Sequence, residues 1–131
     1  MGYYMDQMEA KFKFKDGKDK EILTTIKKIV NEGKIDPYVD KDTINDCKTF
    51  EDALLIFDWE YADYDNGENV VPYIFFVGEI SGDDYRLFRA IAPFVEDNSY
   101  IQMLGEDGAM WRWVFKDGKC REIHPKIIWE V

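Results

Sequence analysis

The side chains in this chain that could carry out chemistry are two cysteines, one histidine and many carboxylates. Cys120 and His124 are the one close pair of soft metal ligands, with three residues between them in the sequence. On a single strand, a rise of about 3.3 Å per residue would separate them by about 13 Å. That distance is too long for one shared metal ion and too long for a nucleophile with its base. A structural cysteine and a surface histidine explain the pair better.

A second candidate is the acidic stretch from Asp63 to Glu68, which is similar to the start of a calcium-binding loop. Its glycine arrives one position early, and the position that should supply a bidentate carboxylate is Ile74. A hairpin turn at Asn66-Gly67 explains the same residues. Asp63 and Asp65 therefore remain weak metal candidates, and we expect no metal site and no cofactor.

Other catalytic arrangements have little support in the sequence. Paired carboxylates can be drawn anywhere in a chain with 27 acidic residues, so such a pair is no evidence for a glycosidase. The turn Gly105 to Gly108 lacks the lysine and the following helix of a phosphate loop, and its acids would repel phosphate. The pattern favours a binding protein over an enzyme.

The formal net charge is −10, and its distribution along the chain is uneven. Residues 35–69 hold eleven acids against Lys41 and Lys48, which leaves −9 in about a quarter of the chain. Such a segment repels phosphate backbones and attracts basic surfaces. The same acidity could also serve only to keep the protein soluble.

The elements that must position these residues follow from hydrophobic periodicity. Alternation over residues 8–14 predicts a strand with one lysine-rich face, and apolar spacing predicts helices near 19–33, 49–57 and 83–92. Thr49 with Asp52, and Ser81 with Asp84, are capping signals, and Asp19 is a candidate N-cap. Residues 34–48 are polar and rich in turn residues, which is typical of a loop with at most a helical turn.

Two hairpins complete the pattern, with turns near Asn66-Gly67 and Glu106 to Gly108. Residues 70–80 are almost wholly apolar, which predicts a central strand that is covered on both faces. Residues 123–131 are expected to close the sheet, with Pro125 marking a break or an edge. We expect these residues to be mostly buried: Phe12, Phe14, Ile26, Leu54, Phe75, Phe88, Ile91 and Ile101.

The element order predicts one α+β domain over residues 1–131. Its expected architecture is a ferredoxin-like antiparallel sheet, with helices mainly on one face and extra C-terminal strands. Two widely spaced cysteines, no long apolar run and no signal-peptide pattern favour a cytoplasmic protein without a membrane partner. The aromatic strand from Trp111 to Phe115 could suggest stacking on single-stranded RNA. The net charge and the scattered bases oppose that interpretation, and core packing explains these residues better.

Several short motifs resemble those of a family of small bacterial, phage and plasmid proteins. They are the opening Met-Gly-Tyr-Tyr, Ala92-Pro93-Phe94-Val95, Ser99-Tyr100-Ile101, Gly105 to Gly108 and Trp111 to Phe115. These motifs mark hairpins of a fold and not a chemistry. Among mobile-element proteins, those that inhibit CRISPR or restriction systems are similar in size and acidity.

We therefore expect a non-enzymatic acidic protein of phage or mobile-element type. It would bind a basic, nucleic-acid-binding target and compete with nucleic acid there, without contacting nucleic acid itself. The alternatives are an enzyme with an unrecognised carboxylate site, and an interaction module whose acidity is incidental. The expected partner-binding residues are Asp36, Asp40, Asp42, Asp46, Asp58, Trp59, Glu60, Tyr61, Asp63, Asp65 and Glu68.

Overall fold

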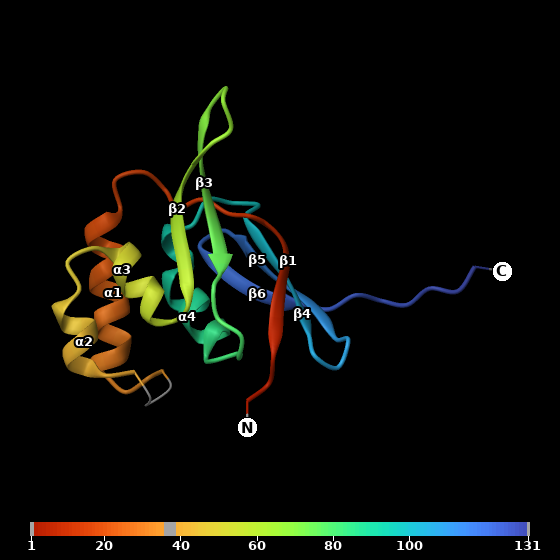
Figure 1. Ribbon diagram of the computed structural model, residues 1–131, viewed down its shortest axis with the longest axis horizontal. Helices are drawn as coiled ribbons and strands as arrows, with labels where there is room; N and C mark the ends of the chain where they lie inside the picture. Colours follow the sequence, from red (N-terminus) through yellow and green to blue (C-terminus); the bar gives the residue numbers. More distant parts are fainter. Residues whose placement is uncertain (1, 36–38, 131) are drawn as a thin grey trace.

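The computed structural model describes residues 2–35 and 39–130 of the chain, which form an α+β fold (Figure 1). The elements run in the order β1 (Met5–Lys11), α1 (Asp19–Asn31), α2 (Lys41–Asp46), α3 (Phe50–Ile56), β2 (Trp59–Asp65), β3 (Val70–Phe76), α4 (Asp84–Ile91), a 3-10 turn η1 (Ala92–Phe94), β4 (Tyr100–Gly105), β5 (Met110–Lys116) and β6 (Lys119–Ile123). The predicted helices correspond to α1, α3 and α4, and the predicted polar loop contains the short helix α2.

All strand pairs are antiparallel, in a four-stranded sheet of order β1-β4-β5-β6 and a separate β2-β3 hairpin. Strand β3 of the hairpin lies beside β1, so the strands follow the ferredoxin-like order, with β5 and β6 added outside β4. Both hairpin turns form where the sequence predicts them, between β2 and β3 and between β4 and β5. The fold class predicted from the sequence is confirmed.

Gln7 joins the two sheets where a backbone ladder is missing. Its Nε2 donates to the carbonyl oxygen of Ile74 at 3.0 Å, and its Oε1 accepts from the backbone N–H of Phe76 at 2.9 Å. The side-chain amide therefore supplies the donor and the acceptor that a neighbouring peptide group would supply in a continuous sheet. Closer to the N-terminus, Met5 N donates to Glu79 O at 3.0 Å, which continues the junction along the backbone.

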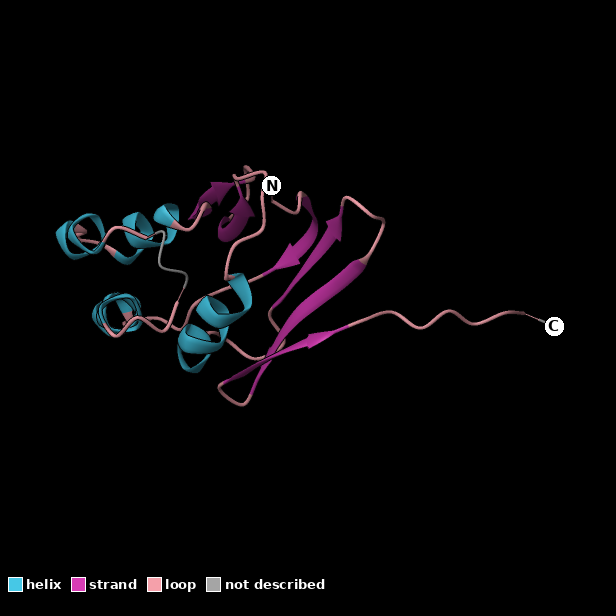
Figure 2. Ribbon diagram, turned by 90° about the horizontal axis from the view of Figure 1, so that it is seen from below, coloured by secondary structure: helices cyan, strands magenta, loops and turns pink. Residues whose placement is uncertain are grey.

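The helices cover one face of the sheets, and the other face of the four-stranded sheet is open to solvent (Figure 2). The core between these layers is rich in aromatic rings. Trp59 packs against Phe88 and Trp113 with ring centroids 4.9 and 5.9 Å apart. Helix α1 adds Ile22 and Ile26, both fully buried. Their spacing of four residues puts them on one stripe of the helix.

Three sequence-based expectations about the strands are wrong. The helices cover only one face of strand β3. Phe75 lies on the opposite, uncovered face and is 48% exposed. The other seven expected core residues are buried. The last strand ends at Ile123, and residues 124–130 are exposed and outside any strand. Pro125 contributes to this ending, since it has no N–H to donate to a ladder.

The helix caps agree with the sequence at one of three positions. The Thr49 hydroxyl accepts from Asp52 N at 3.2 Å, as the capping signal predicts. Asp19 is the first helical residue, preceded by Lys18 as N-cap. At α4 the N-cap is Asp83, because the Asp84 side chain turns into the core instead of capping the helix with Ser81. In the described part of the chain, no helix has the length and apolarity needed to cross a bilayer.

Candidate functional site

The structure divides the expected partner-binding acids into two groups. Asp40, Asp42 and Asp46 are exposed residues of α2 or its N-cap. The other group follows the β2-β3 hairpin: Asp58, Glu60, Asp63, Asp65 and Glu68. Helix α2 lies beside α1, whereas the hairpin tip projects from the body of the molecule (Figure 1). Asp36 lies outside the described residues.

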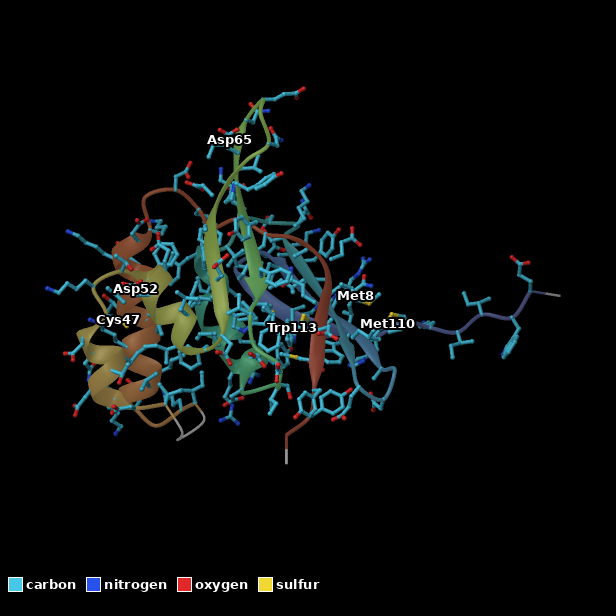
Figure 3. All side chains as sticks on the ribbon, viewed as in Figure 1. Met8, Cys47, Asp52, Asp65, Met110 and Trp113 are labelled. Carbon is cyan, nitrogen blue, oxygen red and sulfur yellow. The ribbon has the colours of Figure 1, made fainter. Side chains whose placement is uncertain are left out.

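We call residues 59–76 the hairpin arm. Its distal half extends past the helices, with Asp65 at its outer end (Figure 3). The turn is held by its own polar side chains: Gly67 N donates to the Asp65 carboxylate at 2.8 Å, and Asn69 N donates to Asn66 Oδ1 at 2.8 Å. Gly67 has a φ of 92°, which a residue with a side chain rarely adopts. The arm is therefore a defined turn and not a loose loop.

The surface of the arm combines negative charge with apolar side chains. Asp63, Asp65 and Glu68 are exposed, and residues 49–85 contain no lysine or arginine to neutralise them. Tyr64 is 57% exposed and Val70 is 64% exposed. Amphipathic tyrosine and aliphatic side chains are favourable contact residues, and carboxylates around them suit a basic partner.

The two proximal acids differ from those at the tip. Glu60 is half-buried and accepts a hydrogen bond of 2.5 Å from the Tyr73 hydroxyl. This hydrogen bond raises the pKa of Tyr73. Asp58 occupies the turn before β2 with a φ of 67°. Glu60 is therefore already hydrogen-bonded within the protein. The exposed acids of the tip, Asp63, Asp65 and Glu68, carry the negative charge that a partner could contact.

Trp59 and Tyr61 are not surface contacts, which corrects the sequence-based expectation. Trp59 is fully buried, and its Nε1 donates to Asp84 Oδ1 at 2.8 Å. Tyr61 is half-buried against Phe14, and its hydroxyl accepts from Phe14 N at 3.2 Å. Burial raises the pKa of Tyr61. Both residues point toward the helices because they share the inward parity of β2.

The aromatic and apolar contacts that the sequence analysis missed are on the opposite parity. Tyr64 pairs with Val71 across the hairpin, and Val71 is 39% exposed. Side chains alternate between the two faces of a strand, so Tyr64 lies on the face of β2 opposite to Trp59. This alternation could have assigned Tyr64 to the outer face. The sequence alone does not say which of the two faces the helices cover.

Asp84 is the one buried carboxylate in the described part of the chain, with 5% exposure. Burial raises its pKa, and hydrogen bonds from Trp59 Nε1 and Gly82 N, the latter at 2.8 Å, act in the opposite direction. A cavity of about 210 Å³ next to it is lined by further rings and carboxylates, including Tyr3, Trp113 and Glu122. Trp113 Nε1 donates to Glu122 at 3.0 Å, and Asp83 lies 3.6 Å from Arg86, so all three acids that line this cavity have structural partners.

The soft ligands do not form a site. Cys120 is buried, and burial raises the pKa of its thiol to about 12, which leaves it protonated and a poor nucleophile at neutral pH. His124 is exposed, with its Nε2 3.3 Å from Glu122 Oε2. Across residues 2–35 and 39–130, no group of three or more histidine, cysteine or acidic side chains could hold a metal ion. The Asp65 carboxylate accepts a hydrogen bond from Gly67 N within the hairpin turn.

A comparison with protein-family models, with curated proteins and with solved structures finds no match to the chain.

Proposed function

We propose that this protein is a non-catalytic binding protein that presents the tip of its hairpin arm to a basic protein. The observation that carries the proposal is an arm that projects from the body, carries exposed acids and apolar side chains, and contains no basic residue.

The mechanism is electrostatic capture followed by short-range contact. Asp63, Asp65 and Glu68 steer a basic surface toward the arm, and such steering increases association rates. Tyr64 and its cross-strand partner Val71 then lose exposed apolar area on contact. The acids of α2 extend the field without forming part of the contact surface.

The partner of this arm is a protein whose basic surface normally binds nucleic acid. Carboxylates spaced along a hairpin can occupy lysine and arginine sites that otherwise hold phosphates, so binding would displace nucleic acid. Within this proposal, the chain acts as an inhibitor of the anti-CRISPR or anti-restriction type. The size and acidity of the chain support that class.

The proposal is tested by capture and competition. The tagged chain is incubated with a bacterial lysate at low and at high salt, and the proteins that elute at high salt are identified. Each recovered protein is then assayed for nucleic-acid binding with increasing amounts of the chain. We expect a basic protein that loses its nucleic acid as the chain is added.

Two matched variants locate the contact. Asp63→Asn, Asp65→Asn and Glu68→Gln together remove three charges from the tip, and the amide introduced by Asp65→Asn keeps the oxygen that Gly67 N requires. Asp42→Asn, Asp46→Asn and Asp52→Asn remove the same charge from exposed positions in α2 and α3. We expect the tip variant to lose capture and the helix variant to keep most of it. Equal loss in both variants, or capture that is indifferent to both, would reject the arm as the contact.

A further inference from the structure

The open face of the four-stranded sheet carries a groove of about 510 Å³ at the ends of β4, β5 and β6. Four basic side chains line it, Arg112, Lys116, Lys119 and Arg121, against the single carboxylate of Asp117. The local charge is therefore 4 − 1 = +3 in a protein whose net charge is −10. This volume is in the usual range for small-molecule sites, about 300–1,000 Å³.

Strand register gathers these bases from separate places in the sequence. Lys116 pairs with Lys119 across the β5-β6 turn, and Arg121 pairs with Val114. Val114 pairs in turn with Tyr100 of β4, and Arg112 is two residues before Val114 on the same face of β5. The bases that look scattered along the sequence thus surround Tyr100 and Val114 on one side of the sheet.

Arg112 and Tyr100 are held in place by neighbouring side chains. The Arg112 guanidinium carbon lies 4.9 Å from the Tyr100 ring centroid, and Arg112 Nε donates to Gln102 Oε1 at 2.7 Å. The Tyr100 hydroxyl donates to Glu9 Oε1 at 2.7 Å. Among the described residues, no carboxylate lies within 4.0 Å of a side-chain nitrogen of the four groove bases. The terminal N–H groups of Arg112 remain available to a ligand.

We propose that this groove binds a phosphate-bearing ligand of the nucleotide type, either as a free nucleotide or within a short single strand. Arg112, Arg121 and Lys119 hold phosphate, since guanidinium groups match its geometry. The Tyr100 ring, with the Arg112 guanidinium over it, gives a surface for a base. This differs from the expectation, based on net charge, that the chain makes no direct contact with nucleic acid.

The position of the groove reduces the repulsion from the acidic arm. The β2-β3 hairpin contacts β1, whereas the residues that line the groove lie on β4, β5 and β6 and in the adjoining turns, with β6 at the opposite edge of the sheet. A ligand in the groove therefore approaches the basic edge. An acidic peptide would match the charge equally well, but it has no base to pack on the Tyr100 ring and the Arg112 guanidinium, and for this reason we favour the nucleotide.

The test is fluorescence anisotropy with a labelled oligothymidylate of about eight nucleotides, within the usual site size of single-strand-binding folds. Unlabelled oligothymidylate of the same length, adenosine monophosphate, inorganic phosphate and hexaglutamate serve as competitors. We expect binding that falls with salt, and displacement by phosphate-bearing competitors in preference to hexaglutamate. Displacement by the mononucleotide identifies a free nucleotide as sufficient, and displacement only by an oligonucleotide identifies a strand.

Arg112→Gln with Arg121→Gln should weaken binding by about tenfold or more, because two charge-assisted contacts are lost. The salt slope should decrease by about 1.4, or about 0.7 for each phosphate contact. Lys116→Gln with Lys119→Gln, at the exposed turn, provides a second variant that does not touch the core.

The control is Lys20→Gln with Lys48→Gln, which removes two charges from exposed positions outside the groove. It should change affinity by less than about twofold, as for charges without a specific contact. No binding of the wild type to any phosphate-bearing probe, an equal loss in the control, or equal displacement by hexaglutamate would overturn the proposal.

Discussion

At the scale of single residues, Asp84 is a carboxylate used for structure. It accepts the indole N–H of Trp59 in a fully buried position between α4 and β2. Asp84→Ala leaves that N–H without an acceptor, which should reduce the free energy of unfolding by about 1–3 kcal/mol. Asp84→Asn keeps the acceptor for Trp59 and removes the buried charge, so it should cost less than the alanine variant. Chemical denaturation measures both, and equal losses would contradict this role for the hydrogen bond.

The same carboxyl predicts a pH dependence. Burial raises the pKa of Asp84 in the folded state above its ordinary value of 3.8. The folded state therefore favours the protonated form, and this contribution to stability is present below pH 3.8 and is lost as pH rises through the folded pKa. The stability of the wild type relative to Asp84→Asn should decrease as pH rises through that range. A difference that stays constant, or increases with pH, would contradict the assignment.

Gln7 gives a second test at this scale, because its amide replaces part of a ladder between β1 and β3. Gln7→Leu leaves Phe76 N and Ile74 O without these partners and should cost about 1–3 kcal/mol. Amide hydrogen exchange should show a specific loss of protection at Phe76. Gln102→Leu, on the open face of β4, removes a hydrogen bond to the exposed Arg112 and should cost about 0.5–1 kcal/mol, without a change in exchange at Phe76. Unchanged exchange at Phe76 would mean that Gln7 does not join the sheets.

At the scale of elements, α4 supplies the centre of the core with Leu87, Phe88 and Ile91, all fully buried. Ile91→Ala should cost about 2–5 kcal/mol through lost burial and a residual cavity. Arg86→Ala, at an exposed site on the same helix with an ion pair to Asp83, should cost less than about 1 kcal/mol. Thermal and denaturant unfolding test the pair, and a loss below about 1 kcal/mol for Ile91→Ala would show that the helix does not pack as described.

Sequence patterns predict elements well where one local signal determines the conformation. Asn66-Gly67 and Asp107-Gly108 specify tight turns, and Ile22, Ile26 and Val30 specify the buried stripe of α1. Strand β3 was harder, because a run that is apolar on both parities does not reveal which face the helices cover. Phe75 and Trp59 are both aromatic residues in predicted strands, yet Phe75 is 48% exposed and Trp59 is fully buried.

The candidate site was predictable only in part, for a similar reason. The acids at the hairpin tip are exposed, but the acidic segment as a whole is divided between α2 and the hairpin, which composition and turn chemistry do not predict. The inward direction of Trp59 and Tyr61 depended on long-range packing against Phe88 and Phe14. The basic groove depended on the register between β4, β5 and β6, which brings Tyr100, Val114 and Arg121 into one row.

At the scale of the whole molecule, the charge is polarised across the sheet. The acidic arm contacts β1, and the basic groove spans β4, β5 and β6 on the other side of that strand. This arrangement gives the protein two surfaces of opposite sign. The net charge of the chain, −10, does not describe either surface, because the residues that line the groove have a local charge of +3.

The most direct test of the acidic arm is the association rate with the basic protein recovered by capture, measured by stopped flow at two salt concentrations. The wild-type rate should fall steeply as the Debye length shortens from about 10 Å at 0.1 M to about 3 Å at 1 M. The triple variant at Asp63, Asp65 and Glu68 should associate more slowly at low salt with a smaller change in dissociation, and the helix variant should resemble the wild type. An association rate that changes neither with salt nor with the tip substitutions would contradict the account. The acidity would then serve only to keep the protein soluble.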